Sequence, residues 1–463
     1  MTPFTPTLPL ECRRKPGKTP RSNTHQRGKV SRERYRAAAA VLGDRAGTVV
    51  EDAVLDVEDG MIAWIGSSTD APPYDGELTR LAGLVAPGLV NAHCHSPMTL
   101  FRGLGEGLPL DRWLQEVMWP REARLRPADV TAAMRLASAE MLRCGVTTSV
   151  EMYVYADAVA AAVHETGARA IVMAPLLAAP GWEHLGTLEE QLERAARQAA
   201  EAGADPMIEV GIGPHAAYTV PLDILGRAGE LARAHDMMLH IHVAETEDEA
   251  AELEAEHGLS VPRLLAEHGV LGGRVLAAHC VWLDDADLDV WAAHDVAVAH
   301  CPQSNAKLAA GIAPLRAMLD RGIRVGLGTD GPASNNNLDL WEEIRLAAQL
   351  ARLRALDAQA LSAAEAFWLA TGGSAAAVDR TDLGQLEPGR AADFCHVDID
   401  DVAFIPVESP SDLLTHLVWS AGSQHVRDTW VAGRQVVADG VCLTVDEAAA
   451  RAEVRERSAA LAR

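Results

Sequence analysis

Two histidines separated by one residue stand in the stretch NAHCHSPMTLFRG, at His93 and His95. In a β-strand, residues i and i+2 point to the same face, so both imidazoles would project in one direction. Such a pair either binds a metal ion or consists of two unrelated polar side chains. The pair alone leaves both alternatives open, and the choice depends on residues elsewhere in the chain.

Three further residues could complete a metal site with this pair. His242, His279 and Asp330 each stand at the end of a β-rich run of the sequence. Three imidazoles and one carboxylate suit Zn²⁺, with Fe²⁺ or Mn²⁺ as alternatives. His240 lies two residues before His242 and on the same face, and we favour His242 as the ligand because it is nearer the end of its run.

A carboxylate stands close to this expected metal site. Glu245 follows His242 by three residues, so it would point away on a continuing strand, but a strand end allows the chain to turn back. A carboxylate beside a metal-bound water is the usual general acid and base. The alternative is that Glu245 only begins the acidic surface helix ETEDEAAELEAEHG.

The elements that must position these residues are eight β-rich runs, which alternate with helical segments after residue 88. This alternation indicates parallel βαβ units, and eight units predict a closed (β/α)8 TIM barrel of the α/β class. The runs are 89–95, 147–154, 168–176, 207–215, 238–245, 274–280, 296–302 and 324–330. A doubly wound open sheet is the alternative, but no GxGxxG follows a first strand.

Most of these runs end in a polar residue. Active sites of such barrels are built at the C-terminal strand ends, where we expect these residues to converge. They are His95, Glu151, His215, His242 with Glu245, His279 and Asp330.

The flanks of the barrel have a different pattern. Residues 49–66 alternate in polarity around a turn at 58–60, which predicts a hairpin, and 427–440 repeat the pattern. Neither flank is long enough to fold alone. The expected organisation is a disordered basic head over 1–34, one small β-sandwich from 35–87 and 385–445, the barrel over 88–384, and a C-terminal helix over 446–463.

The scarcity of lysine bears on the number of metal ions. Lys15, Lys18, Lys29 and Lys307 are the only lysines of the chain. A two-metal site in this kind of barrel commonly needs a carbamylated lysine at a strand end, and Lys307 falls in a loop after the seventh run. We therefore expect a single metal ion.

Composition excludes several classes of protein. The net charge of −24 argues against a nucleic-acid-binding surface, although residues 1–36 hold ten basic and only two acidic residues. No apolar run of about 18 residues predicts a membrane span, and no secretory signal is visible. Seven scattered cysteines without a CxxC pair favour a reduced, cytoplasmic protein. The head could also be a transit peptide or an interaction arm, and a homo-oligomer stays open.

Together the motifs resemble the amidohydrolase superfamily, and within it the mononuclear S-adenosylhomocysteine/5'-methylthioadenosine deaminases, from about residue 35 to 445. The resemblance implies a metal held by His93, His95, His242 and Asp330. The motifs that carry it are VNAHCHSPMTLFRG, GPHAAYT, HIHVAET, AAHCVWL, CPQSNAKLAAGIAPL and GLGTDGPASNNNLDLWEE.

The resemblance also implies roles for the other residues. Glu245 would carry a proton to the ring nitrogen, while His279 would hydrogen-bond the hydrolytic water and, with Asp330, handle its proton. Trp113 and Glu122 would cover the nucleoside and bind its ribose hydroxyls, and His215 would contact the purine. Helix packing for Trp113 and a solvated surface position for Glu122 are the alternatives.

The expected function is therefore metal-dependent hydrolytic deamination of an adenine nucleoside. Family members that accept the homocysteine carboxylate place arginines after the third strand, but here residues 171–193 contain no basic residue except His184. A buried carboxylate without a partner is costly. We therefore expect 5'-methylthioadenosine, 5'-deoxyadenosine or adenosine to be a better substrate than S-adenosylhomocysteine. A hydrolase of another heterocycle (triazine, guanine or pterin) and a catalytically inactive scaffold are the alternatives.

Overall fold

The computed structural model describes residues 32–201, 203 and 205–462. Residues 1–31 of the expected disordered head therefore lie outside the described residues. Strand β1 (Arg32–Val41) begins at the first described residue, so residues 32–34 belong to a strand and not to the head. Arg34 fixes this strand start because it donates two hydrogen bonds to the buried Asp56 on the next strand, at 2.6 and 2.8 Å.

Eight parallel strands form the barrel and confirm the predicted (β/α)8 fold. Each strand falls inside a predicted run or begins one residue before it. They are β6 (Leu89–Cys94), β7 (Val146–Met152), β8 (Arg169–Leu176), β9 (Ile208–Pro214), β10 (Leu239–Val243), β11 (Val275–His279), β12 (Ala297–His300) and β13 (Val325–Leu327). A bridge between Cys94 and Asp330 closes the barrel, with the Asp330 amide donating to the His93 carbonyl at 3.0 Å.

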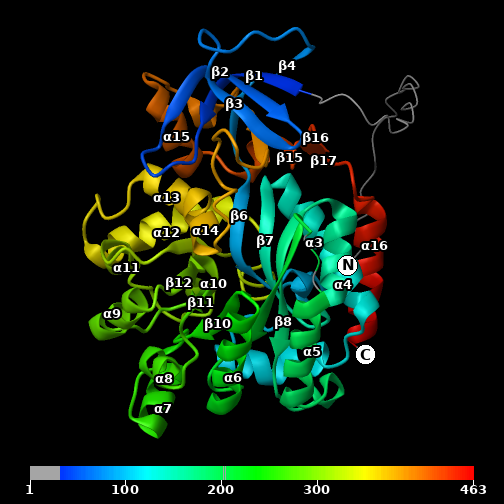
Figure 1. Cartoon of the computed structure of the whole chain (residues 1–463), viewed down its shortest axis with the longest axis vertical. Helices are drawn as coiled ribbons and strands as arrows, with labels where there is room; N and C mark the ends of the chain where they lie inside the picture. Colours follow the sequence, from blue (N-terminus) through cyan, green and yellow to red (C-terminus); the bar gives the residue numbers. More distant parts are fainter. Residues whose placement is uncertain (1–31, 202, 204, 463) are drawn as a thin grey trace, which may run out of the picture. The chain divides into compact units, whose positions relative to one another are not determined.

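Helices follow most of the strands and surround them (Figure 1). They are α3 (Pro127–Arg143), α4 (Ala156–Thr166), α5 (Leu188–Glu201), α6 (Leu222–Ala234), α7 (Glu247–His257), α8 (Val261–Glu267), α9 (Asp285–Ala293), α10 (Pro302–Lys307), α11 (Leu315–Asp320), α12 (Leu340–Ala355), α13 (Ala363–Leu369) and α14 (Gly372–Ala377). Their ends follow local rules. Helix α7, for example, begins at the Thr246 side chain, which accepts from the Glu249 amide, and ends at Gly258 in the left-handed region.

The expected small β-sandwich of the two flanks corresponds in the structure to one nine-stranded sheet, which hydrogen-bonds strands from both flanks together. Strand β5 pairs antiparallel with β14 and so joins the two flanks, while β2–β3 and β15–β16 are the predicted hairpins. Together with β1, the strands are β2 (Val49–Glu58), β3 (Met61–Ser67), β4 (Leu78–Arg80), β5 (Leu84–Pro87), β14 (Phe394–Val397), β15 (Val426–Val431), β16 (Arg434–Ala438) and β17 (Val441–Cys442).

The sheet of the small domain holds the first barrel strand in place. Only Gly88 separates β5 from β6, and a Cβ at this glycine would lie 2.3 Å from the Thr147 hydroxyl, so a larger residue does not fit. The buried rings of Phe394 and Trp430 stack at 4.4 Å within the hydrophobic cluster of this sheet. Packing in this sheet therefore fixes where the strand that carries His93 begins.

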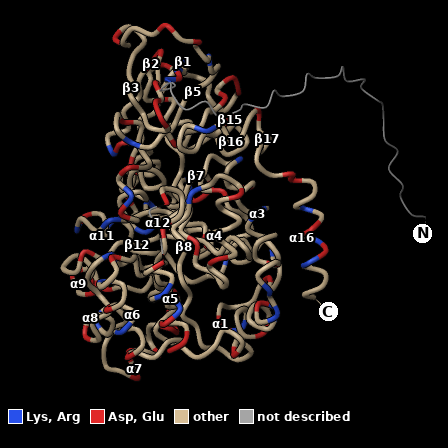
Figure 2. The backbone as a smooth tube through the Cα atoms, turned by 45° about the vertical axis from the view of Figure 1, so that its right-hand side comes forward, with Lys and Arg blue, Asp and Glu red and all other residues tan. Residues whose placement is uncertain are grey.

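Two further helices complete the described chain, α15 (Pro410–Trp419) and α16 (Glu447–Leu461). Helix α16 packs on α3, where Arg457 pairs with Asp129 at 2.7 Å. The chain has 65 acidic and 41 basic residues, and Figure 2 shows both kinds distributed along the tube. Among the described residues, no helix is long and apolar enough to cross a membrane.

Candidate active site

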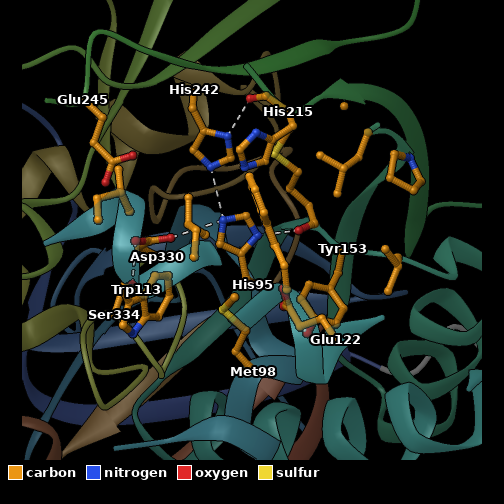
Figure 3. A pocket seen from close by; sticks show the side chains of 18 of the residues that line it. His95, Met98, Trp113, Glu122, Tyr153, His215, His242, Glu245, Asp330 and Ser334 are labelled. Atoms are coloured by element: carbon orange, nitrogen blue, oxygen red, sulfur yellow. Dashed lines mark hydrogen bonds and ion pairs between the residues drawn. The ribbon is translucent and has the colours of Figure 1, made fainter. Parts of the chain in front are cut away.

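The C-terminal ends of four barrel strands bring together the five residues expected at a metal site. Strand β6 carries His93, and His95 follows directly after it; His242 comes from β10 and His279 from the end of β11, while Asp330 follows β13. Figure 3 shows His95, His242 and Asp330 pointing toward one another in the pocket. The side chains are buried, except that His95 is half-buried.

The nitrogen and oxygen atoms of this cluster lie within a few ångströms of one another. One carboxylate oxygen of Asp330, Oδ1, is 3.3 Å from Nε2 of His93 and 3.2 Å from Nε2 of His95. Nε2 of His95 is also 3.2 Å from Nε2 of His242. Potential ligand atoms of His93, His242 and His279 lie within 4.8 Å of one another, as do those of His93, His95 and Asp330.

Hydrogen bonds on the far side of two rings determine which nitrogens face the cluster as acceptors. Nδ1 of His95 donates to the Met152 carbonyl, and Nδ1 of His242 donates to the His215 carbonyl at 2.7 Å. A carbonyl only accepts, so each neutral ring carries its lone pair on Nε2. Two lone pairs would therefore face each other across 3.2 Å, which is unfavourable without a cation between them.

His93 supplies a second sign that the cluster fits a cation. Its buried Nε2 receives no hydrogen bond within the described residues, and the atom it faces at 3.3 Å, Oδ1 of Asp330, is itself an acceptor. Burial lowers the pKa of His93 and of His242 well below the ordinary value, so both rings are neutral at pH 7. Neutral imidazoles with a carboxylate are the donor set of a Zn²⁺ site, and these residues fit such an ion.

Two serines hold the carboxylate of Asp330. The hydroxyls of Ser304 and Ser334 each donate to Oδ2 at 2.6 Å, which leaves Oδ1 facing the histidines. Burial alone would raise the pKa of Asp330, but the close contact with Nε2 of His93 and the neighbouring His95 and His279 rings outweigh it, so the pKa falls well below its usual range. Asp330 is therefore a carboxylate at neutral pH. Sequence reasoning did not single out either serine, although both stand in the motifs CPQSNAK and TDGPASN.

Glu245 turns back toward the cluster because the strand ends at an unusual backbone conformation. Ala244 has φ +47°, and the Ala244 and Glu245 amides donate to the buried Glu249 carboxylate at 3.1 and 2.8 Å. The Glu245 carboxylate thereby comes to 3.7 Å from Nε2 of His279. Burial, and secondarily the Asp330 charge, raise the pKa of Glu245 well above its ordinary value. Such a carboxyl group can hold a proton near neutral pH.

His279 is oriented by a residue that sequence reasoning missed. Its Nδ1 lies 2.9 Å from the Asn305 side-chain oxygen, and an amide oxygen can only accept. Nδ1 therefore donates, and Nε2 faces Glu245 and the cluster. His279 itself has φ +67°, as Asp330 has φ +58°. Left-handed residues at strand ends are uncommon and concentrate at functional sites.

Trp113, Glu122 and His215 line the same pocket as the cluster. Trp113 begins a π-helical turn, η2 (Trp113–Met118), and Glu122 ends the following helix, α2 (Trp119–Glu122). Burial raises the pKa of Glu122, and the Tyr153 hydroxyl donates to its carboxylate at 2.7 Å. Sequence reasoning missed Tyr153, which stands one residue beyond β7.

His215 lies beside the cluster but belongs to neither group of potential metal ligands. Its Nδ1 is 2.9 Å from the Thr219 hydroxyl, and its ring centre is 4.9 Å from that of His242. Burial lowers the pKa of His215 to about 3, so the ring is a neutral hydrogen-bonding group at pH 7.

Glu151 does not join the site, contrary to the expectation for polar strand ends. Its neighbours Val150 and Met152 point into the barrel core, so the alternation of the strand turns Glu151 outward. There the buried carboxylate accepts from the Ser96 and Ser149 hydroxyls at 2.7 Å each and lies 3.1 Å from the Cys94 sulfur.

Many of the residues that line the pocket are apolar. None of the lining residues within the described chain is lysine or arginine. The apolar lining residues include Leu110, Leu114, Trp119, Val154, Leu177 and Trp182.

Comparisons with known proteins agree with this geometry. Residues 84–436 match the model of the amidohydrolase family. The chain is 39% identical over 402 residues to the 5'-deoxyadenosine deaminase of Methanothermobacter thermautotrophicus, covering 87% of this chain and 93% of that one. It is 41% identical over 377 residues to the 5-methylthioadenosine/S-adenosylhomocysteine deaminase of Pelotomaculum thermopropionicum, covering 81% and 86%. A solved adenosine deaminase from Xanthomonas campestris with bound zinc superposes with a TM-score of 0.88 at 36% identity, covering 92% of this chain and 98% of that one.

Proposed function

The chain belongs to the amidohydrolase family, and from this membership we propose that it hydrolytically deaminates an adenine nucleoside with the help of one divalent metal ion. It is a hydrolase of C–N bonds. The observation that carries the proposal is the convergence of imidazole lone pairs and the Asp330 carboxylate beside Glu245, within a pocket that also contains Glu122.

His93, His95, His242 and Asp330 would hold the metal ion. Three neutral imidazoles and one carboxylate favour Zn²⁺, which the structural relative from Xanthomonas campestris binds. When bound, such an ion lowers the pKa of its water toward about 7 and so supplies a nucleophile at neutral pH. Lys307 is engaged elsewhere, with the Ala333 carbonyl at 2.9 Å, which supports a single ion.

The neighbouring residues would move the protons. Water adds to the amine-bearing carbon of the ring, and Glu245, with its raised pKa, donates a proton to the adjacent ring nitrogen. Asp330, which is ionised at neutral pH, accepts one proton from the water. With His279 it delivers this proton to the amine, the C–N bond breaks and ammonia leaves, while the oxygen stays on the ring as a carbonyl and its second proton returns to Glu245.

Glu122 would recognise the sugar of the nucleoside. Its buried carboxylate already accepts from Tyr153, and a ribose diol offers two more hydroxyl donors to the same group. Trp113 would cover the nucleoside and His215 would contact the purine, because both line the pocket that contains this carboxylate and the metal cluster.

The lining of the pocket favours an uncharged 5' substituent. Many of its side chains are apolar, and within the described chain no lysine or arginine contributes to it. The homocysteine carboxylate would be desolvated there without a partner, which is costly. The preferred substrates are therefore 5'-deoxyadenosine, 5'-methylthioadenosine or adenosine.

A panel of ring systems with a Glu122 variant tests the proposal. Ammonia release from adenosine, adenine, guanine and a triazine is measured with the zinc-loaded protein. We expect the highest kcat/KM for adenosine, and at least a tenfold loss for Glu122→Ala, since a sugar hydrogen bond to a charged group contributes about 1.5–3 kcal/mol.

The matched control is Glu116→Ala. Glu116 belongs to the neighbouring π-helical turn, but its side chain is 51% exposed and pairs with Arg112 on the surface, so its removal should leave the rate unchanged. An unchanged adenosine rate in Glu122→Ala, or faster turnover of a free base or triazine than of adenosine, would contradict a nucleoside substrate and indicate another heterocycle.

A further inference from the structure

His93 differs from the other histidines of the cluster in what holds its outer nitrogen. Nδ1 of His95 and Nδ1 of His242 donate to backbone carbonyls, and Nδ1 of His279 donates to an amide oxygen. Nδ1 of His93 instead lies 2.6 Å from Nε2 of His240, a second imidazole. His240 precedes His242 by two residues, so it points from β10 into the barrel as His242 does, one layer deeper.

A fixed backbone carbonyl sets the proton position in His240. Nδ1 of His240 is 2.8 Å from the Leu276 carbonyl on the neighbouring strand β11. Because this carbonyl can only accept, the proton of the neutral His240 ring stands on Nδ1 and its lone pair on Nε2. His93 must then donate from Nδ1, and its own lone pair stands on Nε2, the atom that faces the metal position.

The opposite tautomer of His93 would be favoured without this partner. Nε2 of His93 is 3.3 Å from the Asp330 carboxylate, so a proton on Nε2 would gain a charge-assisted hydrogen bond. A buried Nδ1–H without an acceptor would at the same time cost about 1–3 kcal/mol. Either change moves His93 away from the state that binds a metal ion.

We infer that His240 is a positioning residue. Because the Leu276 carbonyl fixes the proton of His240 on Nδ1, Nε2 of His240 accepts from Nδ1 of His93, and this keeps the metal-facing Nε2 of His93 unprotonated. The inference rests on the proposed metal site and adds a residue that touches neither the ion nor the substrate. It explains why a histidine, with an acceptor on one nitrogen and a donor on the other, stands at a fully buried position.

Zinc affinity measured by competition with a chromophoric chelator tests the inference. Partners behind a metal-binding histidine typically contribute about 10–100-fold to affinity. His240→Phe keeps the ring volume but removes the acceptor, so we expect the dissociation constant for zinc to rise by about 10–100-fold. His240→Gln restores an acceptor oxygen, so we expect a rise well below tenfold.

His300→Phe is the matched control for burying a larger ring in the barrel. His300 is 2% exposed in β12, and its Nδ1 has no hydrogen-bond partner among the described residues. We expect this variant to keep the zinc affinity of the wild type. His240→Leu serves as a second acceptor-free variant if His240→Phe does not fold.

Nitrogen NMR of histidine-labelled protein supplies a readout that a loss of packing would not move. In metal-free wild type we expect the His93 signals of a ring protonated on Nδ1, and in the acceptor-free variant those of a ring protonated on Nε2. Equal zinc affinity in His240→Phe and wild type, or equal losses in His240→Phe and His240→Gln, would overturn the inference. A wild type that binds no metal would instead overturn the proposed site itself.

Discussion

Glu245 combines two features at the scale of a single residue. It is buried beside the Asp330 carboxylate, so its pKa is raised, and it lies 3.7 Å from Nε2 of His279 without contributing to either group of potential metal ligands. A carboxyl group in this position can transfer a proton without holding the ion, and its loss should affect the reaction and leave the metal in place.

The variant Glu245→Gln tests this separation. Because general acid and base catalysis contributes about 10²–10⁴-fold, we expect kcat for adenosine to fall by that factor while the zinc content stays at the wild-type level. Glu247→Gln, at the exposed first residue of helix α7, should behave as the wild type. Loss of zinc from Glu245→Gln, or near-normal turnover, would contradict the assigned role.

The sequence indicates which residues gather but not how their protons are arranged. The HxH spacing and the strand ends predict the positions of His93, His95, His242, His279 and Asp330, which the structure brings together; their roles stay predictions. The tautomers depend on backbone carbonyls of other strands, such as Met152 and His215, and spacing carries no information about these. A position near a strand end was misleading for Glu151. Val150 and Met152 point into the barrel core, so the alternation of β7 turns the Glu151 side chain outward.

At the scale of elements, the small sheet supports the site through the direct connection of β5 to β6. A buried charge network fixes the first strand of this sheet, where Asp56 accepts from Arg32 and Arg34. The side chain of Asp56 is 0% exposed, so its charge depends on these partners. Removing it would leave Arg34 buried and unpaired.

We expect Asp56→Asn to lower the free energy of unfolding by about 3 kcal/mol at pH 7, the range for breaking a buried pair. Urea unfolding followed by circular dichroism measures the loss. Asp52→Asn is the matched control, because its pair with Arg36 on the same two strands is exposed and should contribute at most about 1 kcal/mol. Equal effects of the two variants would contradict the importance of the buried pair.

The pH dependence of this loss has a definite sign. Burial would raise the pKa of Asp56, but the hydrogen bonds from the two arginines outweigh it and lower the pKa below the ordinary value. A carboxylate with a lowered folded pKa stabilises the protein above its unfolded pKa of about 3.9, and this stability is lost as the pH falls through the folded pKa. The difference between wild type and Asp56→Asn should therefore be constant from pH 5 to 7 and shrink only below about pH 4.

The elements themselves were predictable because each barrel strand is a short buried run between helical segments. The structure confirms the eight strands and both flanking hairpins. The π-helical turn from Trp113 was not predictable, since a single inserted residue leaves no periodic signal. The pairing of β5 with β14 was inferred only in outline, because its register depends on contacts about 300 residues apart in the sequence.

At the scale of the whole molecule, one ion would tie together three strands of the barrel, β6, β10 and β13. His93, His242 and Asp330 come from strands far apart in the chain, so binding stabilises the closed arrangement and not the unfolded chain. Ligand that binds only the folded state at 1,000 times its dissociation constant adds about 4 kcal/mol.

Removal of the metal should therefore lower Tm by several degrees, and one equivalent of zinc should restore it. Differential scanning calorimetry together with metal analysis measures both effects. His93→Ala, which lacks one ligand, should show no recovery with one equivalent of zinc. Binding of two ions per chain, or a Tm that does not respond to the metal, would contradict a single-ion site.

The most direct test of the central claim is the initial rate of ammonia release by the zinc-loaded protein from 5'-deoxyadenosine and from S-adenosylhomocysteine under the same conditions. We expect 5'-deoxyadenosine, which carries the adenine ring and the sugar but no charged 5' substituent, to be deaminated. Its kcat/KM should be clearly higher than that of S-adenosylhomocysteine, because within the described chain the pocket lacks a cationic partner for the homocysteine carboxylate. No ammonia from 5'-deoxyadenosine, or a kcat/KM for S-adenosylhomocysteine that equals or exceeds it, would contradict the account.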